Sequence, residues 1–165
     1  MRLLTLVRHA KSSWAETGLS DFDRPLNDRG RRDAPRMAAL LHERLPKPDR
    51  IVSSPALRAI STARIFAAAF GIAEDEIVSD ARIYEATPDT LLRVVNEFDD
   101  GDRHVLMFGH NPGFSELAHR LASCSFDQMP TCAVAHLALS IEHWWEIAPR
   151  CGVLRDYMYP KGLRE

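Results

Sequence analysis

The chain has 165 residues, of which 45% are hydrophobic and 27% charged, a balance typical of a folded globular protein and unlike that of a disordered one. The net charge of −2 provides no overall field that would attract nucleic acid or an anionic membrane, so a basic site has to be local. Three cysteines without C-x-x-C spacing indicate reduced thiols, and no stretch is apolar for long enough to be a signal peptide or a membrane span. We therefore expect one domain over residues 1–165, in the cytoplasm and monomeric by default.

Three short apolar runs predict buried strands, because each run is nearly continuous rather than alternating. They are Leu3–Val7, Arg50–Ser53 and His104–Phe108. Longer stretches with apolar residues at helical spacing separate them. This alternation predicts an α/β protein with a mostly parallel sheet covered by helices.

Two helices are expected before residue 72. The first has its apolar face over residues 34–45, and Pro35 means that it either begins near Asp33 or is kinked there. The second has Ser54 as a candidate N-cap, Pro55 at its first position and Gly71 just after its end.

The rest of the chain predicts two further helices and a hairpin. Thr87 and Pro88 repeat the start signal for a helix whose apolar face extends to Phe98, and another helix follows the third strand over residues 114–122. Residues 131–146 indicate two late strands, with the rings of Trp144 and Trp145 on opposite faces, and the tail is expected to be irregular.

Cationic and titratable side chains follow each of the three predicted strands. Arg8 and His9 follow the first strand, Arg58 lies in the first turn of the helix after the second, and His110 follows the third. The carboxyl ends of parallel strands meet at one edge of a sheet, where helix N-termini also favour anions. An arginine fork matches phosphoryl oxygens, and a histidine serves as donor, base or nucleophile. These residues therefore predict a phosphate site.

Each of these residues also has a structural interpretation. An arginine after a strand is often a solvated strand end, and a single histidine is more often packed and hydrogen-bonded than catalytic. A metal site is the main chemical rival, because imidazole is a common metal ligand. Arg8 and Arg58 would repel a cation, and the sequence has no H-x-x-x-H or H-E-x-x-H spacing. We therefore predict neither a metal nor another cofactor.

Three segments carry a resemblance to a known family. "LVRHAKSSW" resembles the Arg-His-Gly motif region of the histidine phosphatase superfamily, with Ala10 in place of glycine. "SSPALRAISTA" resembles its second-arginine segment, and "LMFGHNPGF" its second-histidine segment. Lys11, "DRPLNDRG" and "YPK" are most similar to the SixA-like branch, so the resemblance covers nearly the whole chain.

The resemblance implies a phosphoglycerate mutase-like fold, in which three α/β/α layers place helices on both faces of the sheet without a lid domain. It implies a metal-independent phosphatase in which His9 is the nucleophile and forms a phosphohistidine intermediate. Arg8, Arg58 and His110 would surround the equatorial phosphoryl oxygens, where charge resides in the transition state. Lys11 and Ser12 are expected to help shape the phosphate pocket.

The proton donor and the substrate are less narrowly defined. Glu85 in "IYEATP" is the best positional candidate for the acid, although it could be a solvated loop carboxylate; Asp21, Asp23 and Asp28 are weaker candidates. The SixA-like branch is associated with protein phosphohistidine, which makes a phosphorylated protein the expected partner. A small phosphomonoester is the alternative substrate, and a phosphate-binding module without turnover is a third possibility.

Overall fold

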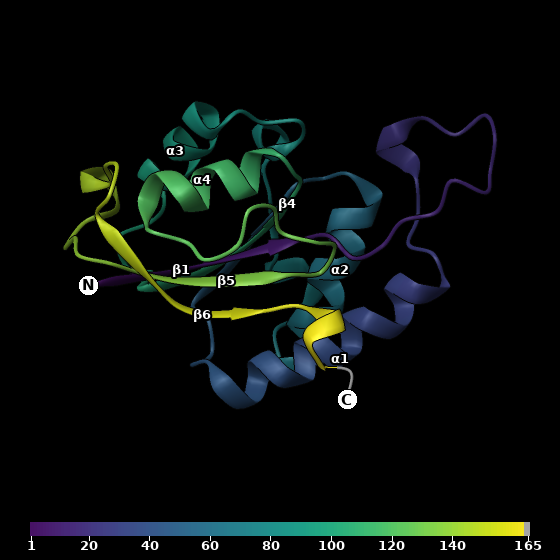
Figure 1. Ribbon diagram of the computed structural model, residues 1–165, viewed down its shortest axis with the longest axis horizontal. Helices are drawn as coiled ribbons and strands as arrows, with labels where there is room; N and C mark the ends of the chain where they lie inside the picture. Colours follow the sequence, from purple (N-terminus) through teal and green to yellow (C-terminus); the bar gives the residue numbers. More distant parts are fainter. Residues whose placement is uncertain (164–165) are drawn as a thin grey trace.

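The computed structural model describes residues 1–163, which form a six-stranded sheet in the order β3-β2-β4-β1-β5-β6 with helices on both faces (Figure 1). β1, β2, β3 and β4 are parallel, whereas β5 pairs antiparallel with β1 and β6 antiparallel with β5. The predicted three-layer α/β/α architecture with a mostly parallel sheet is therefore confirmed. The strands are β1 (Arg2–Arg8), β2 (Arg50–Ser53), β3 (Val78–Ser79), β4 (His104–Gly109), β5 (Val134–Leu139) and β6 (Gly152–Met158); the helices are α1 (Asp28–Arg44), α2 (Leu57–Ala69), α3 (Pro88–Asn96) and α4 (Gly113–Leu121).

The two faces of the sheet carry separate apolar clusters. Because side chains alternate along a strand, Leu4 and Leu6 of β1 pack with α3 and α4, while Val7 packs with α1 and α2. Figure 1 shows α3 and α4 above the sheet and α1 and α2 below it. The central strands are thus buried on both faces, which explains their continuous apolar sequences.

The starts of α1 and α2 differ from the sequence predictions. α1 begins at Asp28, where the Asn27 side chain accepts a hydrogen bond from the Gly30 amide, so Pro35 lies inside the helix and the start near Asp33 was wrong. α2 has Ala56 as its N-cap, so the predicted Ser54 cap was also wrong. The Ser54 hydroxyl instead binds the Ala56 amide and a histidine side chain.

The late hairpin also differs from its prediction. Only Val134–Leu139 of the segment 131–146 is a strand, and its antiparallel partner is β6 in the tail that was expected to be irregular. Trp144 begins a 3-10 turn rather than lying in a strand; its ring is buried, whereas that of Trp145 is exposed. The turn forms because the Trp144 amide and indole donate to Asp100 and to the Asp102 carbonyl, which are tertiary contacts.

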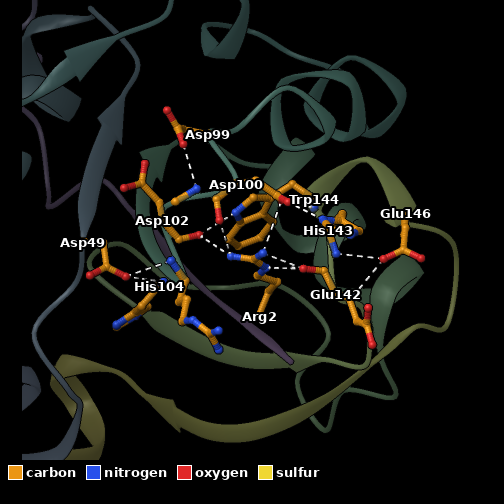
Figure 2. A network of polar contacts seen from close by, with 12 residues as sticks. Arg2, Asp49, Asp99, Asp100, Asp102, His104, Glu142, His143, Trp144 and Glu146 are labelled. Carbon is orange, nitrogen blue, oxygen red and sulfur yellow. Dashed lines mark hydrogen bonds and ion pairs between the residues drawn. The ribbon is translucent and has the colours of Figure 1, made fainter.

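Arg2 fixes the end of the sheet where β1 begins. Its guanidinium donates to the backbone carbonyls of Asp100, Asp102 and Glu142 and pairs with the Asp100 carboxylate (Figure 2). The group is buried and lies over the Trp144 ring, 5.9 Å from its centroid. A buried charge of this kind is tolerated only when its donors are satisfied.

We predict that Arg2→Met lowers the free energy of unfolding by about 3–5 kcal/mol, since it removes the Arg2 hydrogen bonds to three carbonyls and the ion pair with Asp100, of which only Asp100 and the Asp102 carbonyl keep bonds from Trp144. The exposed Arg103 is the matched control, and Arg103→Met should change stability by no more than about 0.5 kcal/mol. Urea unfolding followed by circular dichroism measures both values. Equal effects of the two substitutions would contradict a structural role specific to Arg2.

Candidate active site

Three strand ends are joined by backbone hydrogen bonds at one edge of the sheet. The His9 amide donates to the Gly109 carbonyl at 3.0 Å, and the Ser54 amide donates to the Phe108 carbonyl at 3.0 Å. His9, Ser54 and His110 therefore lie together where the parallel strands end. The rings of His9 and His110 are 5.3 Å apart between centroids. The predicted convergence of these two histidines is confirmed.

A backbone hydrogen bond sets the orientation of His9. Its Nδ1 lies 2.8 Å from the Ala10 carbonyl oxygen, which can only accept, so Nδ1 carries the proton and donates. Nε2 is left with its lone pair. Burial lowers the pKa of His9 to about 3. The hydrogen bond to Ala10 opposes this shift, whereas the charges of His110, Arg58 and Arg8 lower the pKa further. The imidazole is therefore neutral and nucleophilic at physiological pH.

Thr62 connects the residue that orients His9 to helix α2. The Ala10 amide donates to Thr62 Oγ1 at 3.0 Å, and the same hydroxyl donates to the Arg58 carbonyl at 2.7 Å. Thr62 and Ala10 are both fully buried. The nucleophile strand and the helix that carries Arg58 are consequently held in one arrangement.

Ser54 orients the second histidine. Its hydroxyl oxygen accepts from the Ala56 amide at 3.2 Å and lies 2.8 Å from His110 Nε2. Donation of the hydroxyl hydrogen to Nε2 satisfies the serine and places the imidazole proton on Nδ1. Burial and Arg58 lower the pKa of His110 to about 4. The sequence reasoning missed this role because Ser-Pro before a helical pattern is also a cap signal.

Both predicted arginines lie at the site, with their outer nitrogens engaged by protein. Arg8 Nη1 donates to the Met129 carbonyl at 2.9 Å. Arg58 donates to the backbone carbonyl and carboxylate of Asp21 at 2.6 and 2.9 Å. Among residues 1–163, Arg8 Nε, Arg58 Nε and His110 Nδ1 are buried without a hydrogen-bond partner. Leaving such groups unpaired costs free energy, which a small movement that admits an acceptor such as a phosphoryl oxygen would relieve.

Asp21 balances the positive charge of the site. Besides Arg58, it accepts from the Tyr84 hydroxyl at 2.6 Å and from Arg24 Nε at 3.1 Å. The Tyr84 hydrogen bond, with the two arginines, lowers the pKa of Asp21 to about 2. Asp21 is therefore ionised at physiological pH and is not a proton donor. Arg24 and Tyr84 were not identified from sequence, although Arg24 lies in "DRPLNDRG" and Tyr84 precedes Glu85.

The remaining predicted residues lie at different depths. Glu85 is exposed and lines a pocket of about 290 Å³ together with His110. Ser12 is buried and accepts from Arg24 Nη1 at 2.7 Å, so it contacts the site through that arginine. The half-buried Lys11 contributes its backbone carbonyl, which accepts from the Asn27 amide at 3.0 Å. A Cβ on Gly30 would lie only 2.2 Å from that carbonyl, which explains a glycine in the first turn of α1.

Among residues 1–163, no three His, Cys, Asp or Glu side chains come together in a way that could hold a metal ion. No helix in the same residues is long and apolar enough to cross a bilayer.

Comparisons with known proteins assign this fold and site to a family. The profile of the histidine phosphatase superfamily (branch 1) matches residues 4–91. An uncharacterized protein of Mycobacterium tuberculosis is 33% identical, with 94% of this chain and 100% of the relative covered. The chain belongs to the histidine phosphatase superfamily, and its activity is that of a phosphatase.

Solved structures place the chain within that superfamily. A protein assigned as the phosphohistidine phosphatase SixA of Agrobacterium tumefaciens is 30% identical and superimposes with a TM-score of 0.79, covering 96% of this chain and 98% of its own. A SixA structure with tungstate is 23% identical and shares the fold, with a TM-score of 0.78 over 98% and 99% of the two chains. The chain is a member of the SixA-like branch, with the predicted phosphoglycerate mutase-like fold.

We predict that His9 and His110 stay neutral as the pH falls from about 7 to about 5, because the folded protein holds their pKa values near 3 and 4. In the unfolded chain the two imidazoles take up protons near pH 6.5, whereas in the folded protein they do not. The free energy of unfolding should therefore decrease as the pH falls from 6.5 to about 4. Histidine ¹⁵N spectra, assigned with His9→Asn and His110→Asn, measure the protonation of the two imidazoles. Urea unfolding at each pH measures the free energy of unfolding. A His9 titration midpoint near 6.5 would contradict the assignment.

Proposed function

We propose that this phosphatase removes phosphoryl groups from phosphohistidine in proteins, through a covalent phosphohistidine on His9. The observation that carries the proposal is the neutral His9 with Nδ1 engaged by Ala10, next to the unpartnered nitrogens of Arg8, Arg58 and His110. This set combines an oriented nucleophile with donors suited to the charge of a transferring phosphoryl group.

The proposed reaction has two in-line displacements. In the first, the lone pair of His9 Nε2 forms a bond to phosphorus while the bond from phosphorus to the substrate nitrogen breaks. That nitrogen keeps the bonding electron pair, and the substrate imidazole, protonated beforehand by solvent on its other ring nitrogen, leaves neutral. In the second, water forms a bond to phosphorus and gives a proton to solvent while the bond from phosphorus to His9 Nε2 breaks, which releases inorganic phosphate and neutral His9. Arg8, Arg58 and His110 donate to the equatorial oxygens in both steps.

The leaving group favours phosphohistidine over an alkyl phosphate. An imidazole leaves readily once its ring is protonated, whereas an alkoxide depends on an acid supplied by the enzyme. Asp21 is ionised, and Glu85 is exposed at the edge of the site. The solved relative from Agrobacterium is itself assigned as a phosphohistidine phosphatase, which supports the same substrate class here.

His9→Ala should lower turnover by about 10⁴-fold or more, because it removes the imidazole that forms the bond to phosphorus. The variant should still bind tungstate, since Arg8, Arg58 and His110 keep their contacts. Substrate labelled with ³²P should leave alkali-stable, acid-labile label on the quenched wild-type enzyme and none on the variant. His119→Ala, which removes an exposed histidine, is the control. Turnover of His9→Ala within tenfold of the wild type would contradict the mechanism.

The second substrate candidate, a small phosphomonoester, is favoured by one observation: Glu85 lies in the pocket beside His110. If Glu85 is the acid, Glu85→Gln should lower hydrolysis of an alkyl phosphate by about 10²–10⁴-fold while changing phosphohistidine hydrolysis by no more than about tenfold.

Glu116 lines the same pocket and is exposed, so Glu116→Gln is the matched control for the loss of one negative charge. Steady-state kinetics on free phosphohistidine and on glycerol phosphate distinguish the cases. Equal large losses on both substrates would instead assign Glu85 to activation of water. No loss on either would make it a solvated loop carboxylate.

A further inference from the structure

The segment between β1 and α1 contacts the site with its inner side. Asp21 binds Arg58, and the neighbouring Phe22 ring meets Tyr84 edge-on with 5.2 Å between centroids. Tyr84 in turn meets His110 edge-on at 5.4 Å. Figure 1 shows this purple segment extending beyond the sheet at the end to which the arrow of β1 points. The segment therefore borders the entrance to the site.

The outer side of the same segment is apolar and exposed. Trp14 is 73% exposed, and Leu19 and Phe22 are also exposed. Leu57, the first residue of α2, is exposed next to Arg58, and α2 packs against the 3-10 turn Asp21–Asp23. Three of these exposed apolar side chains belong to one segment, and the fourth begins the helix that packs against the turn of that segment. Exposed apolar side chains on adjoining elements indicate an interaction site. We name these four residues the docking rim: Trp14, Leu19, Phe22 and Leu57.

Trp14 is held in place although it is exposed. The Arg24 guanidinium lies 3.5 Å from the centroid of its ring, close enough for a cation–π interaction. Arg24 is buried and fixed by its bonds to Asp21 and Ser12. A ring fixed on such a support loses less side-chain entropy when a partner covers it.

Charge around the site indicates the chemistry of the partner. Glu16 and Asp23 are exposed on the segment of the docking rim, and Glu85 and Glu116 are exposed in the pocket beside His110. The cations Arg24 and Arg58 are buried, and Arg8 and Lys11 are half-buried. A small phosphate dianion is repelled by these carboxylates, whereas basic residues next to a phosphohistidine would be attracted to them.

We propose that the docking rim binds the protein that carries the phosphohistidine, on a surface where apolar and basic side chains flank the modified histidine. This inference rests on the proposed function and adds where and how the protein substrate is recognised. Apolar contacts to Trp14 and Leu19 supply affinity, and the surrounding carboxylates select for lysine or arginine.

Two synthetic phosphohistidine peptides test the proposal, one with leucine and lysine on both sides of the histidine and one with glycine and glutamate. Free phosphohistidine is the third substrate. The wild type should show a kcat/KM at least about tenfold higher for the Leu/Lys peptide than for the Gly/Glu peptide. Trp14→Ala combined with Leu19→Ala should abolish this difference and leave kcat/KM for free phosphohistidine within about twofold.

Trp145→Ala is the matched control, because Trp145 is 59% exposed and belongs to the yellow-green turn at the opposite end of the sheet from the docking rim (Figure 1). It should preserve the preference for the Leu/Lys peptide. Equal kcat/KM for the two peptides with the wild type, or the same loss with Trp145→Ala, would overturn the docking rim while leaving the proposed function intact.

Two further outcomes separate self-association of the chain and failure of the proposed function from failure of the docking rim. Light scattering after size exclusion should give the same molar mass for the wild type and the double variant. A lower mass for the variant, with equal losses on all three substrates, would make the rim an interface between copies of this chain and overturn the proposal. Absence of turnover of all three substrates by the wild type would refute the proposed function itself.

Discussion

In the centre of the sheet, β1 pairs in parallel with β4 so that Arg8 lies opposite Gly109, and this register brings His9 next to His110. β2 joins the other side of β4, which adds Ser54 and the start of α2 at the same edge. A slip of one residue would exchange the two faces of β1 and separate the two histidines. The apolar residues of β1 on both faces therefore fix the geometry of the candidate site as well as the core.

The same edge concentrates positive charge, and the fold compensates for it in two ways. Burial keeps His9 and His110 neutral by lowering their pKa values, so that the imidazoles add no charge to that of Arg8 and Arg58. Asp21 supplies a carboxylate that holds Arg58 from outside. At this edge, within residues 1–163, the Arg8 Nε, Arg58 Nε and His110 Nδ1 atoms are buried without hydrogen-bond partners, a cost that a bound phosphoryl group would relieve.

Much of the fold follows from local sequence patterns, and the predictions that failed did so because tertiary contacts decide those segments. Continuous apolar runs predicted β1, β2 and β4, and Thr87 with Pro88 predicted the start of α3, where the threonine side chain accepts from the Thr90 amide. β6 escaped prediction because it is an edge strand with mixed polarity, whose place is set by pairing with β5 and by packing of a few of its side chains on the core. The turn at Trp144 depends on Asp100 and Asp102, which are more than forty residues away in the chain.

The sequence by itself determined that Arg8, His9 and His110 lie at strand ends and Arg58 in the first turn of the helix that follows β2, because residue order along an α/β chain dictates which positions reach the carboxyl edge. Only the tertiary structure decided how those residues are tuned. Ser54 was taken as a helix cap and instead orients His110, while Asp21 holds Arg58 rather than offering a proton. The hydrogen bond from Ser54 to His110 and the burial and charges that shift the pKa of His9 come from groups distant in sequence. Such contacts depend on packing in three dimensions, which local sequence patterns do not encode.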